Sequence, residues 1–253
     1  MNFLIKLIIF ALGLTIGSFL NCVIYRMEEG KSFLRGHSFC PHCKHVLEWR
    51  DLIPVFSFLI LKGKCRYCHQ KISWQYPLVE LSTAFIFLFI FLTSPSNIYT
   101  MVYLLLISCF FIVIFVYDLK HYIIPDKVIH PAIFLALIYN LINYPTFLKN
   151  LLAAVGAGAF FFFIFLISQG KWMGFGDGKL AFLMSLFLGF PNILTALFLA
   201  FFIGAIIGIT LIILKRKKFK SEVPFAPFLV IGTFIALFLG NQILSFYLKF
   251  FKF

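Results

Sequence analysis

Long apolar runs alternate with short polar segments along most of this chain. The runs cover residues 3–25, 77–93, 98–117, 128–144, 150–168, 180–190, 192–214 and 225–248. A helix that crosses about 30 Å of hydrocarbon needs about 20 apolar residues, whereas transmembrane strands alternate polar and apolar residues over about 10 positions. The pattern therefore predicts an all-α, polytopic membrane protein with about eight transmembrane helices. Run 180–190 is short for a span unless its helix begins near Gly178.

The composition excludes several other protein classes. Of the 253 residues, 62% are hydrophobic, 12% are charged and 37 are Phe, whereas soluble domains average about 45–50% apolar and about 25% charged residues. A water-soluble fold could not bury this much apolar surface, and a disordered chain would not carry it. The absence of a short repeat and the presence of only 6 Cys exclude collagen-like and disulfide-scaffold proteins.

The positions of the basic residues predict the topology. Connections 26–76, 118–127, 169–179 and 215–222 hold nine, two, two and five Lys/Arg, which is 18 of the 22, while the alternate connections 94–97, 145–149 and 189–192 hold only Lys149. Because cytoplasmic loops of membrane proteins are enriched in Lys and Arg, the four charged connections are expected in the cytoplasm and both termini outside. The net charge of +13 then reflects topology and anionic lipid rather than nucleic-acid binding. The basic cluster at 215–220 is interpreted as a lipid anchor.

Three regions are expected. Residues 1–25 form a first transmembrane helix, which we interpret as retained because it has no A-x-A-like cleavage site. Residues 26–76 form a small cytoplasmic loop domain, and residues 77–253 form a membrane domain of seven helices.

The loop contains two matched cysteine pairs. Cys40-Pro41-His42-Cys43 is followed, after 21 residues, by Cys65-Arg66-Tyr67-Cys68. Two C-x-x-C pairs supply the four thiolates of a structural Zn²⁺ site, and metal binding would stabilise a loop too small to form its own core. A disulfide pairing is disfavoured by the reducing cytoplasm, and a redox motif by the lack of a thioredoxin-like pattern.

Other potential ligands lie near these cysteines. His37, His42, His45 and His69 are close in sequence and could replace a ligand, although solvated loop histidines are the simpler interpretation. Cys22 and Cys109 sit alone in apolar runs, which is typical of packing residues.

Two aspartates border the membrane on the same predicted side. Asp118 directly follows the run 98–117, and Asp177 lies in Gly174-Phe175-Gly176-Asp177-Gly178-Lys179 just before the run that starts at Leu180. Two facing carboxylates can share one proton and act as a base and an acid in the attack of water on a carbonyl. The three glycines are expected to allow unusual backbone conformations and close approach of a substrate. Lys179 either favours ionisation of a nearby carboxylate or faces lipid phosphates.

Other interpretations of the aspartates remain open. Asp177, and Asp126 after Pro125, could be helix caps; this is a weaker interpretation of Asp118, because a negative charge is unfavourable at a helix C-terminus. An ion-coupled transporter would use Asp118 and Asp177 as a proton relay, although no repeat of interrupted helices is visible. A membrane-anchored zinc adaptor would use the aspartates only as caps.

Taken together, these motifs resemble the type IV prepilin peptidase/N-methyltransferase family, which are membrane aspartic peptidases of the GxGD kind. The similar segments, in order, are Gly17–Asn21, Val23–Arg26, the two cysteine pairs, Ile53–Val55, Gly63–Cys65, Tyr76–Glu80, Asp118 with Ile124–Asp126, and Gly174–Lys179.

The resemblance implies a specific reaction and site. Asp118 and Asp177 would be the catalytic pair, with Asp126 a third candidate, in an enzyme of the bacterial cytoplasmic membrane whose active site faces the cytoplasm. Such enzymes cleave a basic leader from prepilins or pseudopilins and then methylate the new N-terminus with S-adenosylmethionine. No methyl-donor site is recognisable in the sequence. Glu80 is a candidate for it, although pairing with a loop arginine is the interpretation we favour.

Overall fold

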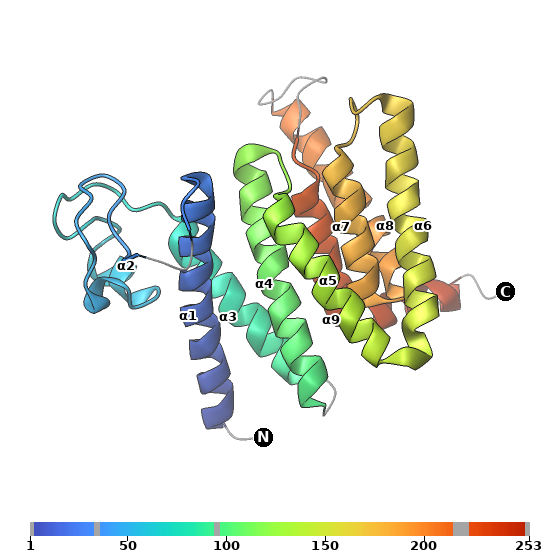
Figure 1. The fold of residues 1–253 in the computed structure, drawn as a ribbon, viewed down its shortest axis with the longest axis horizontal. Helices are drawn as coiled ribbons and strands as arrows, with labels where there is room; N and C mark the ends of the chain where they lie inside the picture. Colours follow the sequence, from blue (N-terminus) through green and yellow to red (C-terminus); the bar gives the residue numbers. More distant parts are fainter. Residues whose placement is uncertain (1–2, 33–35, 94–96, 215–222, 251–253) are drawn as a thin grey trace. The chain divides into compact units, whose positions relative to one another are not determined.

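The computed structural model describes residues 3–32, 36–93, 97–214 and 223–250 (Figure 1). The helices in these ranges are α1 (Phe3–Glu28), η1 (Trp49–Asp51, a 3-10 helix), α2 (Phe56–Ile60), α3 (Gln75–Thr93), α4 (Ile98–His121), α5 (Asp126–Ile142), α6 (Tyr144–Ser168), α7 (Phe175–Leu188), α8 (Asn192–Ile213) and α9 (Ala226–Phe250). The described residues contain no β-strand, only two isolated bridges in the cysteine loop. The prediction of an all-α protein is confirmed. The basic cluster at 215–220 lies outside the described residues.

Within the described ranges, six helices are long and apolar enough to cross a membrane: α1, α3, α4, α6, α8 and α9. Each of the eight predicted runs forms a helix, but α5 has 17 residues and α7 has 14, which is short for about 30 Å of hydrocarbon. Helix α7 begins at Phe175, before the apolar run that starts at Leu180. The first turn of the helix contains two glycines and Asp177, so it is not part of the apolar pattern. The turn expected before α8 is present, and Gly189 in it has a φ of +70°.

The chain divides into two compact units, Met1–Val113 and Ile114–Phe253. In the first, α1 packs against α3 through glycines that bring the two backbones together. A Cβ added to Gly13 would lie 2.5 Å from the Cα of Ala84, and one added to Gly17 would lie 2.7 Å from the Cα of Glu80. The amide of Asn21 donates to the carbonyl oxygen of Tyr76 (3.1 Å). The end of α1 and the start of α3 are thus held together at the two ends of the cysteine loop.

Helix α7 is at the centre of the second unit. It packs against α5, α6, α8 and α9, and its side chains from Leu180 to Phe187 are mostly buried. At the end of α7 away from Asp177, the side-chain amide of Asn140 on α5 donates to the carbonyl oxygen of Leu186 (2.9 Å). The Oδ1 of Asn140 accepts a hydrogen bond from the side chain of Asn150 on α6 (2.8 Å). This packing fixes the first turn of α7, where Asp177 lies.

Candidate active site and metal centre

Asp177 is the third residue of α7. Its Oδ2 accepts a hydrogen bond from the backbone N–H of Gly174, the residue that caps the helix (3.1 Å). The capping interpretation of Asp177 is therefore confirmed, and the positive end of the helix dipole stabilises a carboxylate at this position. The side chain is only 8% exposed, so the cap lies inside the protein rather than in solvent.

Asp118 lies in the last turn of α4 and is 5% exposed. The backbone N–H of Ala226, the first residue of α9, donates to its carboxylate. Its Oδ2 is buried and has no hydrogen-bond partner among the described residues. A buried carboxylate oxygen without a partner carries a desolvation cost of about 1–3 kcal/mol or more, and a helix C-terminus makes the charge less favourable still. An aspartate at position 118 therefore does not stabilise the fold.

The two carboxylates lie close enough to interact electrostatically, although they are 59 positions apart in the sequence. Both belong to the second unit, and each receives a backbone N–H from the start of a helix, α7 for Asp177 and α9 for Asp118. Because two adjacent carboxylates cannot both ionise cheaply, such a pair holds one proton between them. The arrangement can supply a base and an acid at one place.

The glycines around Asp177 have a different role from the one expected. None of Gly174, Gly176 and Gly178 has a positive φ, so the prediction of unusual backbone conformations was wrong. A Cβ on Gly176 would lie 3.1 Å from Ile124, and one on Gly178 would lie 3.6 Å from the carbonyl oxygen of Gly158. These glycines let α7 approach α6 and the segment that precedes α5.

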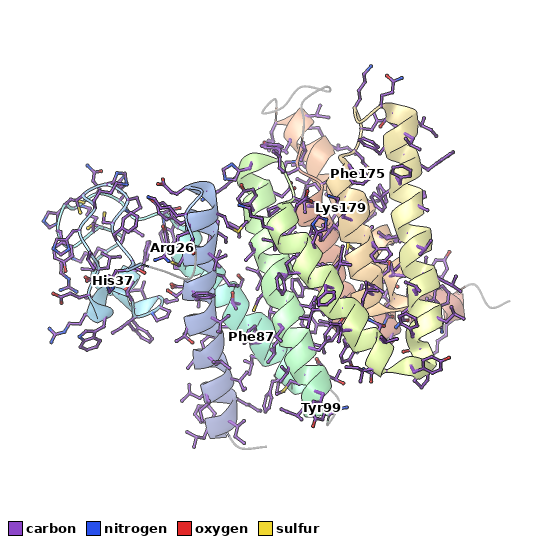
Figure 2. All side chains as sticks on the ribbon, in the orientation of Figure 1. Arg26, His37, Phe87, Tyr99, Phe175 and Lys179 are labelled. Carbon is purple, nitrogen blue, oxygen red and sulfur yellow. The ribbon has the colours of Figure 1, made fainter. Side chains whose placement is uncertain are left out.

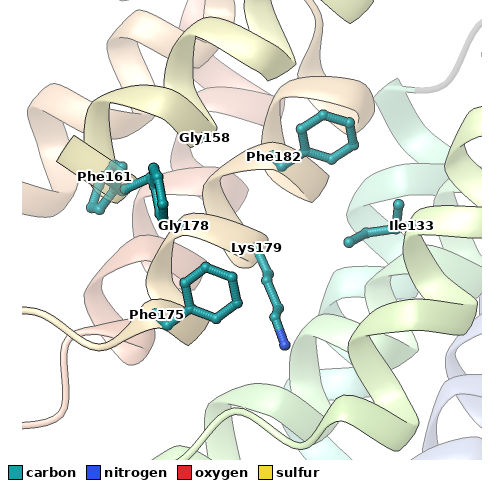
Figure 3. Close-up of a pocket in the computed structure, with 8 residues that line it drawn as sticks. Ile133, Gly158, Phe161, Phe175, Gly178, Lys179 and Phe182 are labelled. Atoms are coloured by element: carbon teal, nitrogen blue, oxygen red, sulfur yellow. The ribbon is translucent and has the colours of Figure 1, made fainter. Parts of the chain in front are cut away.

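Lys179 pairs with Asp126, the first residue of α5, with 2.6 Å between Nζ and Oδ1. Lys179 also borders a cavity of about 250 Å³ between α5, α6 and α7 (Figure 3), which is otherwise lined by Ile133, Gly158, Phe161, Phe162, Phe175, Gly178 and Phe182. The Asp126 side chain is 60% exposed, whereas the other two aspartates are buried. Asp126 therefore differs from Asp118 and Asp177 in its environment: it is exposed and paired with Lys179, whereas the other two are buried.

The four loop cysteines form a compact cluster. The Sγ atoms of Cys40, Cys43, Cys65 and Cys68 all lie within 4.8 Å of one another, and those of Cys40 and Cys68 are 3.9 Å apart. Four thiolates bound to Zn²⁺ at about 2.3 Å would hold their sulfurs about 3.8 Å apart. The spacing of the cluster thus fits a tetrahedral metal site.

The turns that contain Cys40–Cys43 and Cys65–Cys68 have the same backbone hydrogen bond and a left-handed residue after the second cysteine. The N–H of Lys44 donates to the carbonyl oxygen of Cys40 (2.9 Å) and the N–H of His69 donates to that of Cys65 (3.0 Å). Lys44 and His69 both adopt a positive φ, +59° and +57°. Burial raises the pKa of the Cys65 thiol, but N–H groups of Cys68 and Tyr67 stabilise its thiolate and bring the pKa down to about 7. The backbone of the loop thus stabilises the thiolate of Cys65.

The other predicted ligands lie outside this cluster, which contains four cysteines and no histidine among the described residues. The ring of His45 stacks on Tyr67, with 3.7 Å between the ring centroids. Cys22 and Cys109 are half-buried helical residues. They are less buried than a packing role suggested.

Two buried charges hold the loop, and one of them was missed in the sequence. Arg26 donates to the carbonyl oxygens of Ser32 (3.3 Å), Gly36 (2.7 Å) and His37 (3.3 Å) (Figure 2). Glu80 accepts the backbone N–H of Val55 (2.7 Å). The expected partner of Glu80, a loop arginine, was wrong. Glu80 also has a side-chain hydrogen bond with Ser18. The backbone groups that bind the two charges carry no residue-type signal in a sequence.

Two family models match most of the chain, and curated relatives match nearly all of it. Residues 11–94 match the bacterial peptidase A24 N-terminal domain, and residues 104–209 match the type IV leader peptidase family. The prepilin leader peptidase/N-methyltransferase of Aeromonas salmonicida is 32% identical over 96% of this chain and 93% of its own length. The protein of the same name from Bacillus subtilis is 32% identical over 96% of this chain and 97% of its own length. No solved structure matches.

Proposed function

The chain belongs to the type IV leader peptidase family, and from this membership we propose that it cleaves the leader peptide of prepilins and methylates the N-terminus that cleavage exposes. The observation that best supports the peptidase activity is the buried Oδ2 of Asp118, which has no hydrogen-bond partner in the described part of the chain and belongs to a carboxylate that interacts with that of Asp177. A buried ionisable pair that folding does not explain is typical of a catalytic site.

In the proposed mechanism the two aspartates share the acid and base roles. The ionised carboxylate takes a proton from a water molecule, which attacks the carbonyl carbon of the scissile peptide. The protonated carboxyl polarises the carbonyl oxygen, and a proton then passes to the leaving amine as the C–N bond breaks. The N–H groups of Gly174 and Ala226 fix the orientation of the two side chains.

We further propose that α5 and α7 also cross the membrane, which gives eight spans with the charged connections in the cytoplasm. Helix α7 packs against the longer helices α6, α8 and α9, and α5 packs against α6 and α7. On this topology the aspartate pair lies at the cytoplasmic membrane surface. The basic leader of a prepilin or pseudopilin would reach it there while the apolar helix of the substrate stays in the bilayer. The division into residues 1–25, 26–76 and 77–253 stays a prediction.

We propose Zn²⁺ as the metal of the cysteine cluster. Cys40, Cys43, Cys65 and Cys68 would hold it, and it would supply folding free energy to a loop with little core. Four thiolates leave no open coordination position, so its role is structural rather than catalytic.

S-adenosylmethionine is the methyl donor that the methyltransferase activity implies. The apolar cavity beside Lys179 does not fit it, because its volume of about 250 Å³ is below the roughly 300–1,000 Å³ of typical ligand pockets and it offers few polar groups. Glu80 is already engaged by Val55. We assign no residue to the methyl donor.

The test is cleavage by the purified full chain in detergent. The substrate is a peptide with a basic leader followed by an apolar helix, and mass spectrometry detects both the cut and any N-methylation. We expect cleavage to be lost in Asp118→Asn and in Asp177→Asn and to survive inhibitors of serine, cysteine and metallopeptidases. An ion-coupled carrier would instead show no cleavage in the wild type and a proton flux that depends on the same residues.

A further inference from the structure

The cysteine loop exposes large apolar side chains although it contains no membrane-spanning helix. We call Trp49, Phe56, Leu59, Ile60 and Trp74 the aromatic face of the loop; each is 60–74% exposed. Helix α2, which supplies three of them, buries Phe58 as its one buried residue. Soluble proteins rarely leave a contiguous apolar surface uncovered, and such surfaces usually mark an interaction site.

These side chains come from elements that contact one another. Helix α2 contacts η1, which contributes Trp49, and the ring of Phe58 packs against that of Trp74 with 4.9 Å between the centroids. The residues of the aromatic face therefore lie on segments that contact one another. It is not a set of scattered positions.

The face is continuous with a helix that meets lipid. Trp74 directly precedes α3, and the N–H of Leu78 in the first turn of α3 donates to the carbonyl oxygen of Trp74 (3.2 Å). Leu78 is 61% exposed on a helix that is a candidate membrane span. Both ends of the loop also join candidate spans, α1 and α3. The loop is therefore tethered close to the membrane surface.

The charge of the loop is suited to anionic lipid. Residues 36–74 contain six Lys/Arg and two acidic residues. The Asp51 side chain is only 4% exposed, and its Oδ1 lies 2.7 Å from Arg66 Nε. Glu48 is therefore the exposed acid of this segment. The Arg50 guanidinium lies 5.3 Å from the Trp49 ring centroid, and Lys62 and Lys64 directly follow α2.

We propose that the aromatic face of the loop binds the surface of an anionic bilayer, with Trp49, Phe56, Leu59, Ile60 and Trp74 in the headgroup region and Arg50, Lys62 and Lys64 against lipid phosphates. Trp is favoured at this depth because its ring is apolar and its N–H is polar. Basic residues add attraction to anionic headgroups. The inference is independent of the peptidase activity, since no catalytic residue takes part.

Tryptophan quenching by brominated lipid tests this surface in the full, zinc-loaded chain. A variant with Trp74→Phe and Trp172→Phe leaves Trp49 as the single reporter and is placed in nanodiscs with and without anionic phosphatidylglycerol. We expect lipid brominated high on the acyl chain to reduce Trp49 emission, and phosphatidylglycerol to increase this loss. Adding Leu59→Gln and Ile60→Gln should restore emission, whereas Val46→Gln, at an exposed loop residue outside the face, should not.

Zinc content measured on each variant shows that the loop is still folded. Trp49 emission that is insensitive to brominated lipid in every disc would overturn the proposal. So would quenching that occurs in discs with one copy of the chain and disappears in discs with two, because a second copy would then cover the face.

Discussion

Loss of the Glu80 carboxylate should release the cysteine loop at Val55. Glu80 is 6% exposed, and its Oε2 accepts the Val55 N–H at 2.7 Å. Val55 has a φ of +61°, a conformation that costs a β-branched residue about 1–3 kcal/mol and persists only where other contacts enforce it. The hydrogen bond to Glu80 is the contact that the structure shows at this amide.

The size of the effect follows from this one bond. A hydrogen bond to a charged group contributes about 1.5–3 kcal/mol, which corresponds to an increase on the order of 10- to 150-fold in the population of the opened loop. Hydrogen–deuterium exchange of the peptide that contains Val55 measures that population in the metal-loaded chain. Glu80→Ala should accelerate exchange by this factor, and Glu80→Gln, which keeps an acceptor oxygen, should do so less.

The matched control is Glu29→Ala, which removes an exposed glutamate paired with Lys31 at the loop start. It should leave exchange at Val55 unchanged, because surface ion pairs contribute little. Unchanged exchange in a folded Glu80→Ala variant would refute the reasoning. The carboxylate would then have a role other than holding the loop.

Three further predictions test other parts of the structure. Gly17→Leu should lower the thermal unfolding midpoint in detergent, since overpacking costs about 1–3 kcal/mol or more. The control Gly156→Leu should leave the midpoint unchanged, because a Cβ added there meets nothing within 4 Å. Equal effects of the two changes would contradict the close crossing of α1 and α3. Asp126→Asn should keep cleavage within a few-fold, because Asp126 is exposed and paired with Lys179; complete loss of turnover would place it in the catalytic pair. Cys40→Ser should remove bound zinc in elemental analysis and expose the loop to proteolysis, and zinc loss with unchanged proteolysis would argue against a structural metal.

The helices and the cysteine cluster could be predicted because their signals are local. An apolar run long enough to meet lipid becomes a helix whatever its neighbours, and C-x-x-C brings two thiolates together within one turn. The polar starts of helices were harder to place. Phe175–Lys179, which the sequence pattern assigns to the connection 169–179, belongs to α7. Its Asp177 caps the helix, and its glycines allow close packing against α6.

The contacts that hold the loop could not be predicted for a different reason. Arg26 and Glu80 bind backbone carbonyl and amide groups, and every residue carries these groups. The partner of Lys179 was also hidden, because Asp126 is 53 positions away and only the packing of α5 against α7 brings it close. The sequence predicts which charges need a partner but not which partner they find.

The most direct test of the central claim is a double-mutant cycle on the cleavage rate of the full chain. If Asp118 and Asp177 act as one unit, Asp118→Asn and Asp177→Asn should each lower the cleavage rate by several orders of magnitude to a similar residual rate, measured at high enzyme concentration, and the double variant should be no slower than either. All three proteins should stay folded with unfolding midpoints close to that of the wild type, since asparagine keeps the side-chain size and an oxygen that can accept the N–H of Gly174 or Ala226. Substantial cleavage in either single variant, or losses that multiply in the double variant, would contradict a shared catalytic role.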